Sequence, residues 1–166
     1  MHKTEYSISK ISYANANMSR IMHACLKNWL IDPKILNFVS PSLNFPFRYA
    51  QWLKLYKSIT KKNIEHQSYV IKKNEDLIVG HLSISFNKKM NEAHLFHLII
   101  DPKFKRNGLA QNLINFAESY AIIKKTNSTS FHINKKNKAM INLIKKIGYE
   151  SKNPNKKIIN YTKIIT

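Results

Sequence analysis

The sequence predicts a single α/β (α+β) domain, residues 1–166, with a mixed, mostly antiparallel central sheet and helices on both faces. Two observations support this fold class. The chain has 166 residues and is 43% hydrophobic, which suits one compact core, and its composition shows no break that would mark a boundary. Strand-like and helix-like hydrophobic patterns also alternate along it, in the order β-α-α-β-β-β-α-β-α-β-β.

The N-terminal third predicts one strand and two helices. Alternating apolar residues indicate a strand at 6–12. Apolar residues spaced by three and four then predict amphipathic helices from about 17 to 30 and from about 47 to 58, separated by a proline-rich segment. The second helix carries an aromatic stripe that is typical of a core face but could also form the floor of an acceptor pocket. Its residues are Tyr49, Trp52, Leu53 and Tyr56.

A hairpin and a third strand follow. Residues 66–72 and 77–86 flank a short polar turn, and 93–100 form the next strand. In the second hairpin strand, Ser83 and Ser85 alternate with apolar residues, so we expect the serines to face water or a ligand.

The C-terminal part predicts alternating helices and strands. Helical spacing begins at Leu109 and continues to about Lys125, and residues 128–134 form a strand. A second helix over 137–147 ends at Gly148, because glycine readily adopts the left-handed conformation found at helix ends. Short strands at 149 and 158–165 complete the chain.

The chain is strongly basic, with 28 Lys and Arg against 9 Asp and Glu and a formal net charge of +19. Such a charge suits a polyanion, so a nucleic-acid partner is one alternative. The excess, however, is lysine spread over nearly every segment, which is also how a solvated surface looks.

No signal peptide or membrane-spanning run is apparent in the sequence, so we expect a cytoplasmic protein without a membrane partner, as a monomer or homodimer. The single cysteine, Cys25, fits a reducing compartment. It lies on an apolar helix face and is expected to be a small buried hydrophobe rather than a nucleophile.

One stretch has the chemistry of an anion site. Leu98–Ala110 contains an apolar strand, a stop at Pro102, a basic turn and Gly108 at the start of a helix. The free N–H groups of a helix N-terminus carry partial positive charge, and Lys105 and Arg106 add two full charges beside them. These features together suit a phosphate.

This stretch and a second one resemble the two motifs of the GNAT superfamily of acetyl-CoA-dependent N-acetyltransferases. Leu98–Ala110 is similar to the first motif, with Lys105 where arginine or glutamine is usual. Asn137–Tyr149 is similar to the second, with Met140 where alanine is usual. The chain's three glycines fall where the family tends to have them. These are Gly80, Gly108 and Gly148.

The resemblance implies acetyl-CoA as co-substrate, no metal, and a primary amine of a small molecule or protein as acceptor. The backbone of Leu98 and Ile100 would pair with the pantetheine arm, and N–H groups between Lys105 and Ala110 would hold the pyrophosphate. Asn137 would contact the cofactor, cap its own helix, or do both. The implied cofactor-binding residues are Leu98, Ile99, Ile100, Lys105, Arg106, Asn107, Gly108, Leu109, Ala110 and Asn137.

For catalysis, the resemblance implies the Leu98 N–H as donor to the thioester carbonyl. We favour His94 as the base that takes the amine proton, because imidazole titrates near neutral pH and His94 lies close to the family's base position. Glu92 is the second candidate, and His81 is the third. Regular strand alternation predicts that His97 points to the opposite face from His94, which argues against a metal site formed by the two.

One departure from the family pattern bears on activity. Its usual helix tyrosine, the expected proton donor to the leaving thiolate, aligns with Ile144. Water could replace that donor, but the change keeps open the alternative of a catalytically silent acyl-CoA-binding or regulatory protein. A nucleic-acid-binding module would differ from both, since its affinity would fall steeply with salt and it would not respond to acetyl-CoA.

Overall fold

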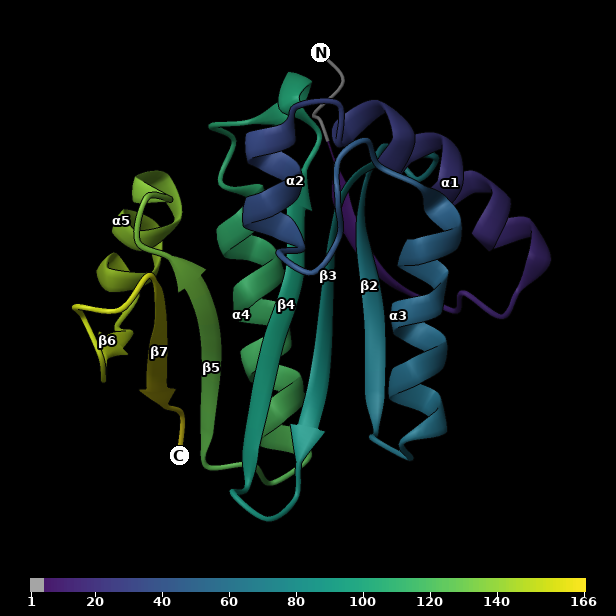
Figure 1. Cartoon of the computed structure of the whole chain (residues 1–166). Helices are drawn as coiled ribbons and strands as arrows, with labels where there is room; N and C mark the ends of the chain where they lie inside the picture. The colour runs from purple at the N-terminus through teal and green to yellow at the C-terminus, as the bar shows by residue number, and fades with distance from the viewer. Residues whose placement is uncertain (1–4) are drawn as a thin grey trace.

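The computed structural model describes residues 5–166, which form a seven-stranded sheet in the order β1-β2-β3-β4-β5-β7-β6. Every neighbouring pair is antiparallel except β4 and β5, which run parallel (Figure 1). The predicted fold class is confirmed. The strands are β1 (Tyr6–Ile11), β2 (His66–Lys73), β3 (Leu77–Asn87), β4 (Glu92–Ile100), β5 (Ser128–Asn134), β6 (Glu150–Ser151) and β7 (Ile158–Ile164).

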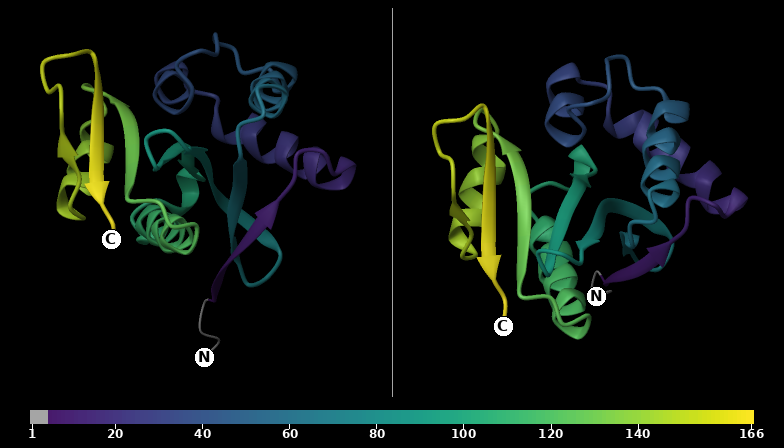
Figure 2. Two further views of the ribbon diagram at one scale, coloured as in Figure 1. Left: turned by 90° about the horizontal axis from the view of Figure 1, so that it is seen from below. Right: turned by 60° about the horizontal axis from the view of Figure 1, so that its bottom comes forward.

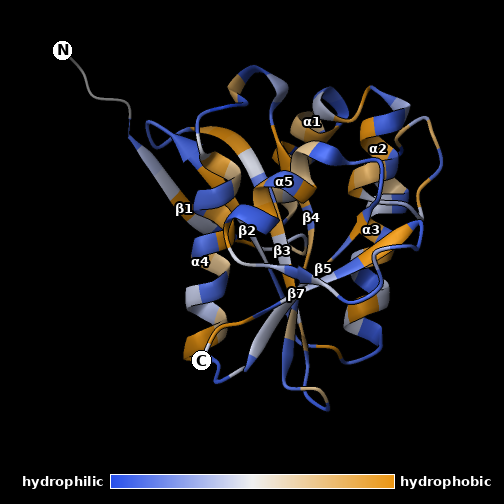
Figure 3. Ribbon diagram, turned by 90° about the vertical axis from the view of Figure 1, so that its left-hand side faces the viewer, coloured by the Kyte–Doolittle hydropathy of each residue, from blue (hydrophilic) through white to orange (hydrophobic). Residues whose placement is uncertain are grey.

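Within residues 5–166, five α-helices are present. They cover the two faces of the sheet (Figure 2). One core cluster lies between the sheet and α4 and α5, and a second lies between the sheet and α1, α2 and α3. The helices are α1 (Ala16–Trp29), α2 (Pro33–Val39), α3 (Tyr49–Lys61), α4 (Leu109–Ile123) and α5 (Lys138–Lys146). In Figure 3 most loops are hydrophilic and the hydrophobic segments gather on the strands and helices. Among the described residues, 5–166, no helix is long and apolar enough to cross a membrane.

The N-terminal region has one more helix than expected. α2 begins where the sequence predicts only a proline-rich break. The side chain of Asp32 accepts a hydrogen bond from the Lys34 N–H, and Pro33 occupies the first helical position, where its missing N–H costs nothing. Because this helix is only seven residues long, its apolar periodicity is too short to recognise.

The aromatic stripe of α3 and the serines of β3 meet in the core. Trp52 and Tyr56 are buried against the sheet. Ser83 is fully buried and its hydroxyl lies 2.7 Å from Tyr56 Oη. The expectation that the serine face of β3 meets water or a ligand is therefore wrong for Ser83, because α3 covers it.

Candidate active site

The central sheet divides between β4 and β5. These strands pair only at their first residues, ending with His94 opposite Ser130. Beyond that row they diverge, as Figure 1 shows toward the top of the sheet, and α2 lies in front of the gap. The edge of β4 from Phe96 to Ile100 that faces β5 therefore has no strand partner on that side.

A β-bulge changes the direction of side chains within β4. The register with β3 shifts between Ser83, which pairs with Phe96, and His81, which pairs with Ile99. His97 is the bulged residue, with a φ of 52°. It consequently lies on the same face as His94 and Phe96, and the expectation that His97 points away from His94 is wrong.

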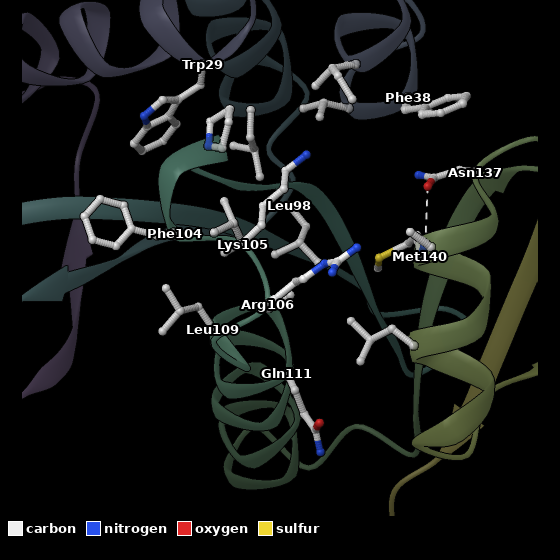
Figure 4. A pocket seen from close by; sticks show the side chains of 18 of the residues that line it. Trp29, Phe38, Leu98, Phe104, Lys105, Arg106, Leu109, Gln111, Asn137 and Met140 are labelled. Atoms are coloured by element: carbon white, nitrogen blue, oxygen red, sulfur yellow. Dashed lines mark hydrogen bonds between the residues drawn. The ribbon is translucent and has the colours of Figure 1, made fainter. Parts of the chain in front are cut away.

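The first pocket lies between the end of β4, the start of α4 and the start of α5, and has a volume of about 360 Å³. Gly108 adopts a φ of 73° just before α4, and a Cβ added there would meet nothing within 4 Å. The first N–H groups of α4 have no partner within the helix. This end of the helix lines the pocket. Figure 4 shows Arg106 between α4 and the first turn of α5, with Lys105 beside Leu98.

Nine of the ten sequence-predicted cofactor residues line this pocket together. The exception is Asn107, whose side-chain amide donates to the carbonyls of Phe104 and Lys105 and so stabilises the loop from outside. Asn137 caps α5 by accepting from the Met140 N–H at 3.4 Å, and it also lines the pocket.

Sequence reasoning missed the residues that form the opposite wall of the first pocket. α1 and α2 supply aromatic and aliphatic side chains there, and α5 supplies others. The Asp32-Pro33 pair was the one signal that could have indicated α2, because an aspartate cap followed by proline is typical of a helix start. The missed lining residues include Trp29, Ile35, Phe38, Val39, Phe104, Met140 and Leu143.

A second pocket, also about 360 Å³, adjoins the first. Both are lined by Leu98, Asn137 and Met140 and by two side chains of α2. The second differs by gathering histidines from two strands, His94 and His97 from β4 and His132 from β5. The two pockets therefore meet where the sheet divides.

His94 is held by the neighbouring strand. Its Nδ1 lies 3.0 Å from Ser130 Oγ, which in turn donates to Glu92 Oε1 at 2.7 Å. The ring centroids of His94 and His132 are 4.4 Å apart. Burial lowers the pKa of His94 to about 4, with a further contribution from His132. His94 is therefore neutral at pH 7.

The other candidate bases are placed less favourably. Glu92 lies at the start of β4 and lines neither pocket. His81 is fully buried, bonded to Tyr13 Oη at 2.9 Å and to the His97 carbonyl at 2.8 Å, and burial lowers its pKa to about 4. His97 has both ring nitrogens occupied, by Tyr56 and by Ser40.

Two other positions considered in the sequence, Cys25 and Ile144, lie in packed surroundings. Cys25 is half-buried on α1, and burial raises the pKa of its thiol, with Asp101 adding to the effect. Ile144 is fully buried in the core cluster between the sheet and α4. Among residues 5–166, no three His, Cys, Asp or Glu side chains are grouped so that they could hold a metal ion.

Comparison with known proteins identifies the family of this chain. The model of the acetyltransferase (GNAT) family matches residues 29–149, so the chain belongs to that family. This confirms the resemblance recognised from the two motifs. No curated protein matches the sequence.

Solved structures share the whole fold at low sequence identity. Spermidine N-acetyltransferase from Vibrio cholerae, in complex with CoA and spermine, is 16% identical with a TM-score of 0.73, covering 96% of this chain and 95% of its own. PaiA N-acetyltransferase from Thermoplasma acidophilum, in complex with coenzyme A, is 12% identical with a TM-score of 0.69, covering 96% and 99%. A domain from Methanocaldococcus jannaschii is 15% identical with a TM-score of 0.73, covering 98% and 99%.

Proposed function

We propose that this protein transfers the acetyl group of acetyl-CoA to a primary amine. One observation carries the proposal: two pockets meet where β4 and β5 diverge, one at a cationic helix start and the other beside a neutral histidine. Such a junction would let a thioester arrive from one side and an amine from the other.

The first pocket suits the phosphates and the pantetheine arm of acetyl-CoA. Lys105, Arg106 and the free N–H groups at the start of α4 would bind the pyrophosphate, because charge-assisted hydrogen bonds to an anion are strong. The unpaired edge of β4 near Leu98 and Ile100 would pair with the amides of the pantetheine arm, as a strand would.

The second pocket suits the chemical step. His94 is neutral at pH 7 and accessible to the pocket, so it can accept a proton. Because its lowered pKa makes it a weak base, it would act on the N–H as the C–N bond forms and that proton becomes acidic. The Leu98 N–H is the expected donor to the carbonyl oxygen, where it would stabilise developing negative charge.

The lining of the second pocket also limits the acceptor. In the described part of the chain no Asp or Glu lines it. The protein carries a net charge of +19, so an acceptor with several positive charges would be repelled without a carboxylate to offset them. We therefore expect a primary amine, on a small molecule or a protein, that carries no further positive charge nearby.

A thermal melt tests the cofactor and an amine screen tests the transfer. Acetyl-CoA at about a hundred times its dissociation constant should add roughly 2.7 kcal/mol of stability, well beyond the effect of ATP as a phosphate control. Release of free CoA thiol with monoamines, but much less with spermidine, would support both the transfer and the acceptor class.

The same experiment separates the alternatives. No melting shift with millimolar acetyl-CoA would contradict the proposal. A shift without transfer to any amine would favour the catalytically silent acyl-CoA-binding protein that Ile144 keeps open.

A further inference from the structure

Three polar side chains form a hydrogen-bonded series at the point where the sheet divides. Glu92 and His94 lie two residues apart on one face of β4, and Ser130 of β5 is paired with His94 across the parallel strands. His94 Nδ1 is 3.0 Å from Ser130 Oγ, and Ser130 Oγ is 2.7 Å from Glu92 Oε1. Ser130 is fully buried, so its hydroxyl is shielded from bulk water.

The proton count of this series fixes the state of the imidazole. A serine hydroxyl has one proton, and an ionised carboxylate can only accept, so Ser130 donates its proton to Glu92. The hydroxyl oxygen is then left to accept from His94. Nδ1 must therefore carry the ring proton, and Nε2 is the nitrogen with the free lone pair.

Nε2 is also the nitrogen that a substrate could reach. Within residues 5–166, Nε2 makes no hydrogen bond. It is also not one of the fully buried polar atoms without a partner, so it is not sealed off inside the protein. Because His94 lines the second pocket, its basic nitrogen is available there while the protonated nitrogen is anchored in the sheet.

We propose that Ser130 is a positioning residue, which connects His94 to the Glu92 carboxylate and holds the imidazole in the tautomer that presents a basic Nε2 to the acceptor amine. The inference rests on the proposed function. It gives Glu92 a role different from that of a base: its charge, transmitted through Ser130, stabilises His94 when His94 becomes positively charged.

The proton balance of the step is simple. As the amine nitrogen forms its bond to the acetyl carbon, its proton passes to Nε2, and the C–S bond then breaks to release the thiolate. Throughout the step, the Nδ1–H of His94 donates to Ser130 Oγ, and the Ser130 hydroxyl donates to Glu92 Oε1. The proton on Nε2 then leaves to the thiolate or to water, which restores neutral His94 and yields free CoA thiol.

The titratable groups around His94 oppose each other in this arrangement. Glu92 favours the charged imidazole through Ser130, whereas His132 disfavours it. Burial disfavours it as well. His97 faces the same pocket, and burial together with His81 and His94 lowers its own pKa well below the usual range. Removal of the link to Glu92 should therefore make His94 still harder to protonate.

The test combines a spectroscopic and a kinetic measurement on the full chain. Long-range ¹H–¹⁵N correlation spectra report which ring nitrogen of His94 is protonated. We expect protonated Nδ1 in the wild type and a shift toward protonated Nε2 in Ser130→Ala. The kcat of Ser130→Ala should fall roughly ten- to hundred-fold, with unchanged KM for acetyl-CoA, because base orientation and not cofactor binding is lost.

Variants that keep the fold make the result decisive. Ser130→Thr retains the hydroxyl and should recover most of the activity. Ser128→Ala, two residues earlier on the same face of β5, is the matched control and should retain wild-type kcat. Glu92→Gln should lower kcat while leaving KM for acetyl-CoA unchanged.

Two outcomes would overturn the inference: a wild-type His94 protonated at Nε2, or a Ser130→Ala variant with wild-type kcat and pH profile. The acetyl-CoA melt is independent of both. If the melt fails, the proposed function fails, and the tautomer spectrum still decides whether Ser130 orients His94.

Discussion

The two pockets that meet at the divided sheet are built in different ways. Most of the first comes from one continuous stretch, Leu98–Gln111, in which a strand end, a basic turn and a helix start follow one another along the chain. The second combines α2 and the segment after it, β4, β5, the start of α5 and the start of β7. Backbone geometry dominates the first pocket, and side chains brought together by tertiary structure dominate the second. A local motif can therefore encode an anion site, whereas an acid–base site depends on strand register.

The largest expected effect is at the second pocket. His94→Ala should lower kcat roughly a hundred-fold near pH 7, equivalent to roughly 2.7 kcal/mol of transition-state stabilisation, because it removes the imidazole nitrogen that would accept the amine proton. KM for acetyl-CoA should change little, which steady-state kinetics would show. His23→Ala, on the outer side of α1, serves as the control, and similar losses in both variants would remove the catalytic assignment.

The histidines around the second pocket should also make the fold sensitive to acid. Burial lowers the pKa of His81, His94 and His97 below that of an unfolded chain. As the pH falls toward 6.5 and below, the unfolded state therefore binds more protons than the folded state. The stability that is present at neutral pH is lost as the pH falls from 7 toward 4.

Between pH 7 and pH 6 this loss amounts to about 0.7 kcal/mol per histidine, or about 2 kcal/mol for the three. Urea unfolding at the two pH values measures it. A variant of the first pocket, Arg106→Asn, should lose the same amount as the wild type. Equal stability at pH 6 and pH 7 would show that these histidines are not buried as neutral groups.

The smallest effect is expected at the first pocket. Arg106→Asn should weaken acetyl-CoA binding roughly ten-fold, about 1.4 kcal/mol, because it removes one charge-assisted contact while the backbone donors remain. Asparagine tolerates the φ of 64° that Arg106 adopts, so the backbone change is minimal. Titration calorimetry gives the affinity, and the exposed Lys103, which does not line the pocket, provides the Lys103→Gln control. An equal loss in the control would mean that general surface charge, rather than a defined site, attracts the ligand.

The parts of the fold and site that depend on local sequence could be predicted, whereas the parts that depend on tertiary structure could not. The strand at 128–134 and the loop before α4 were predicted where they lie, because each depends on a local pattern. The short α2 was missed, since seven residues give too little periodicity.

The bulge at His97 could not be predicted, because it depends on how β4 pairs with β3 rather than on the residues of β4 alone. The contact between His94 and Ser130 has the same origin, as it joins residues 36 positions apart. His94 itself was found as a candidate, but its orientation and its altered basicity arise only from the packed structure.

Because β4 and β5 pair over only a few residues, a strand in the middle of the sheet has the properties of an edge strand. β4 is the fourth of seven strands, yet beyond His94 its amides on one side lack a neighbouring strand, as they would at the rim of a sheet. Hydrogen exchange should therefore be fast for part of a central strand whose other side is well protected. A molecule that bound along this edge of β4 would complete the sheet, and slower amide exchange there would report its binding residue by residue.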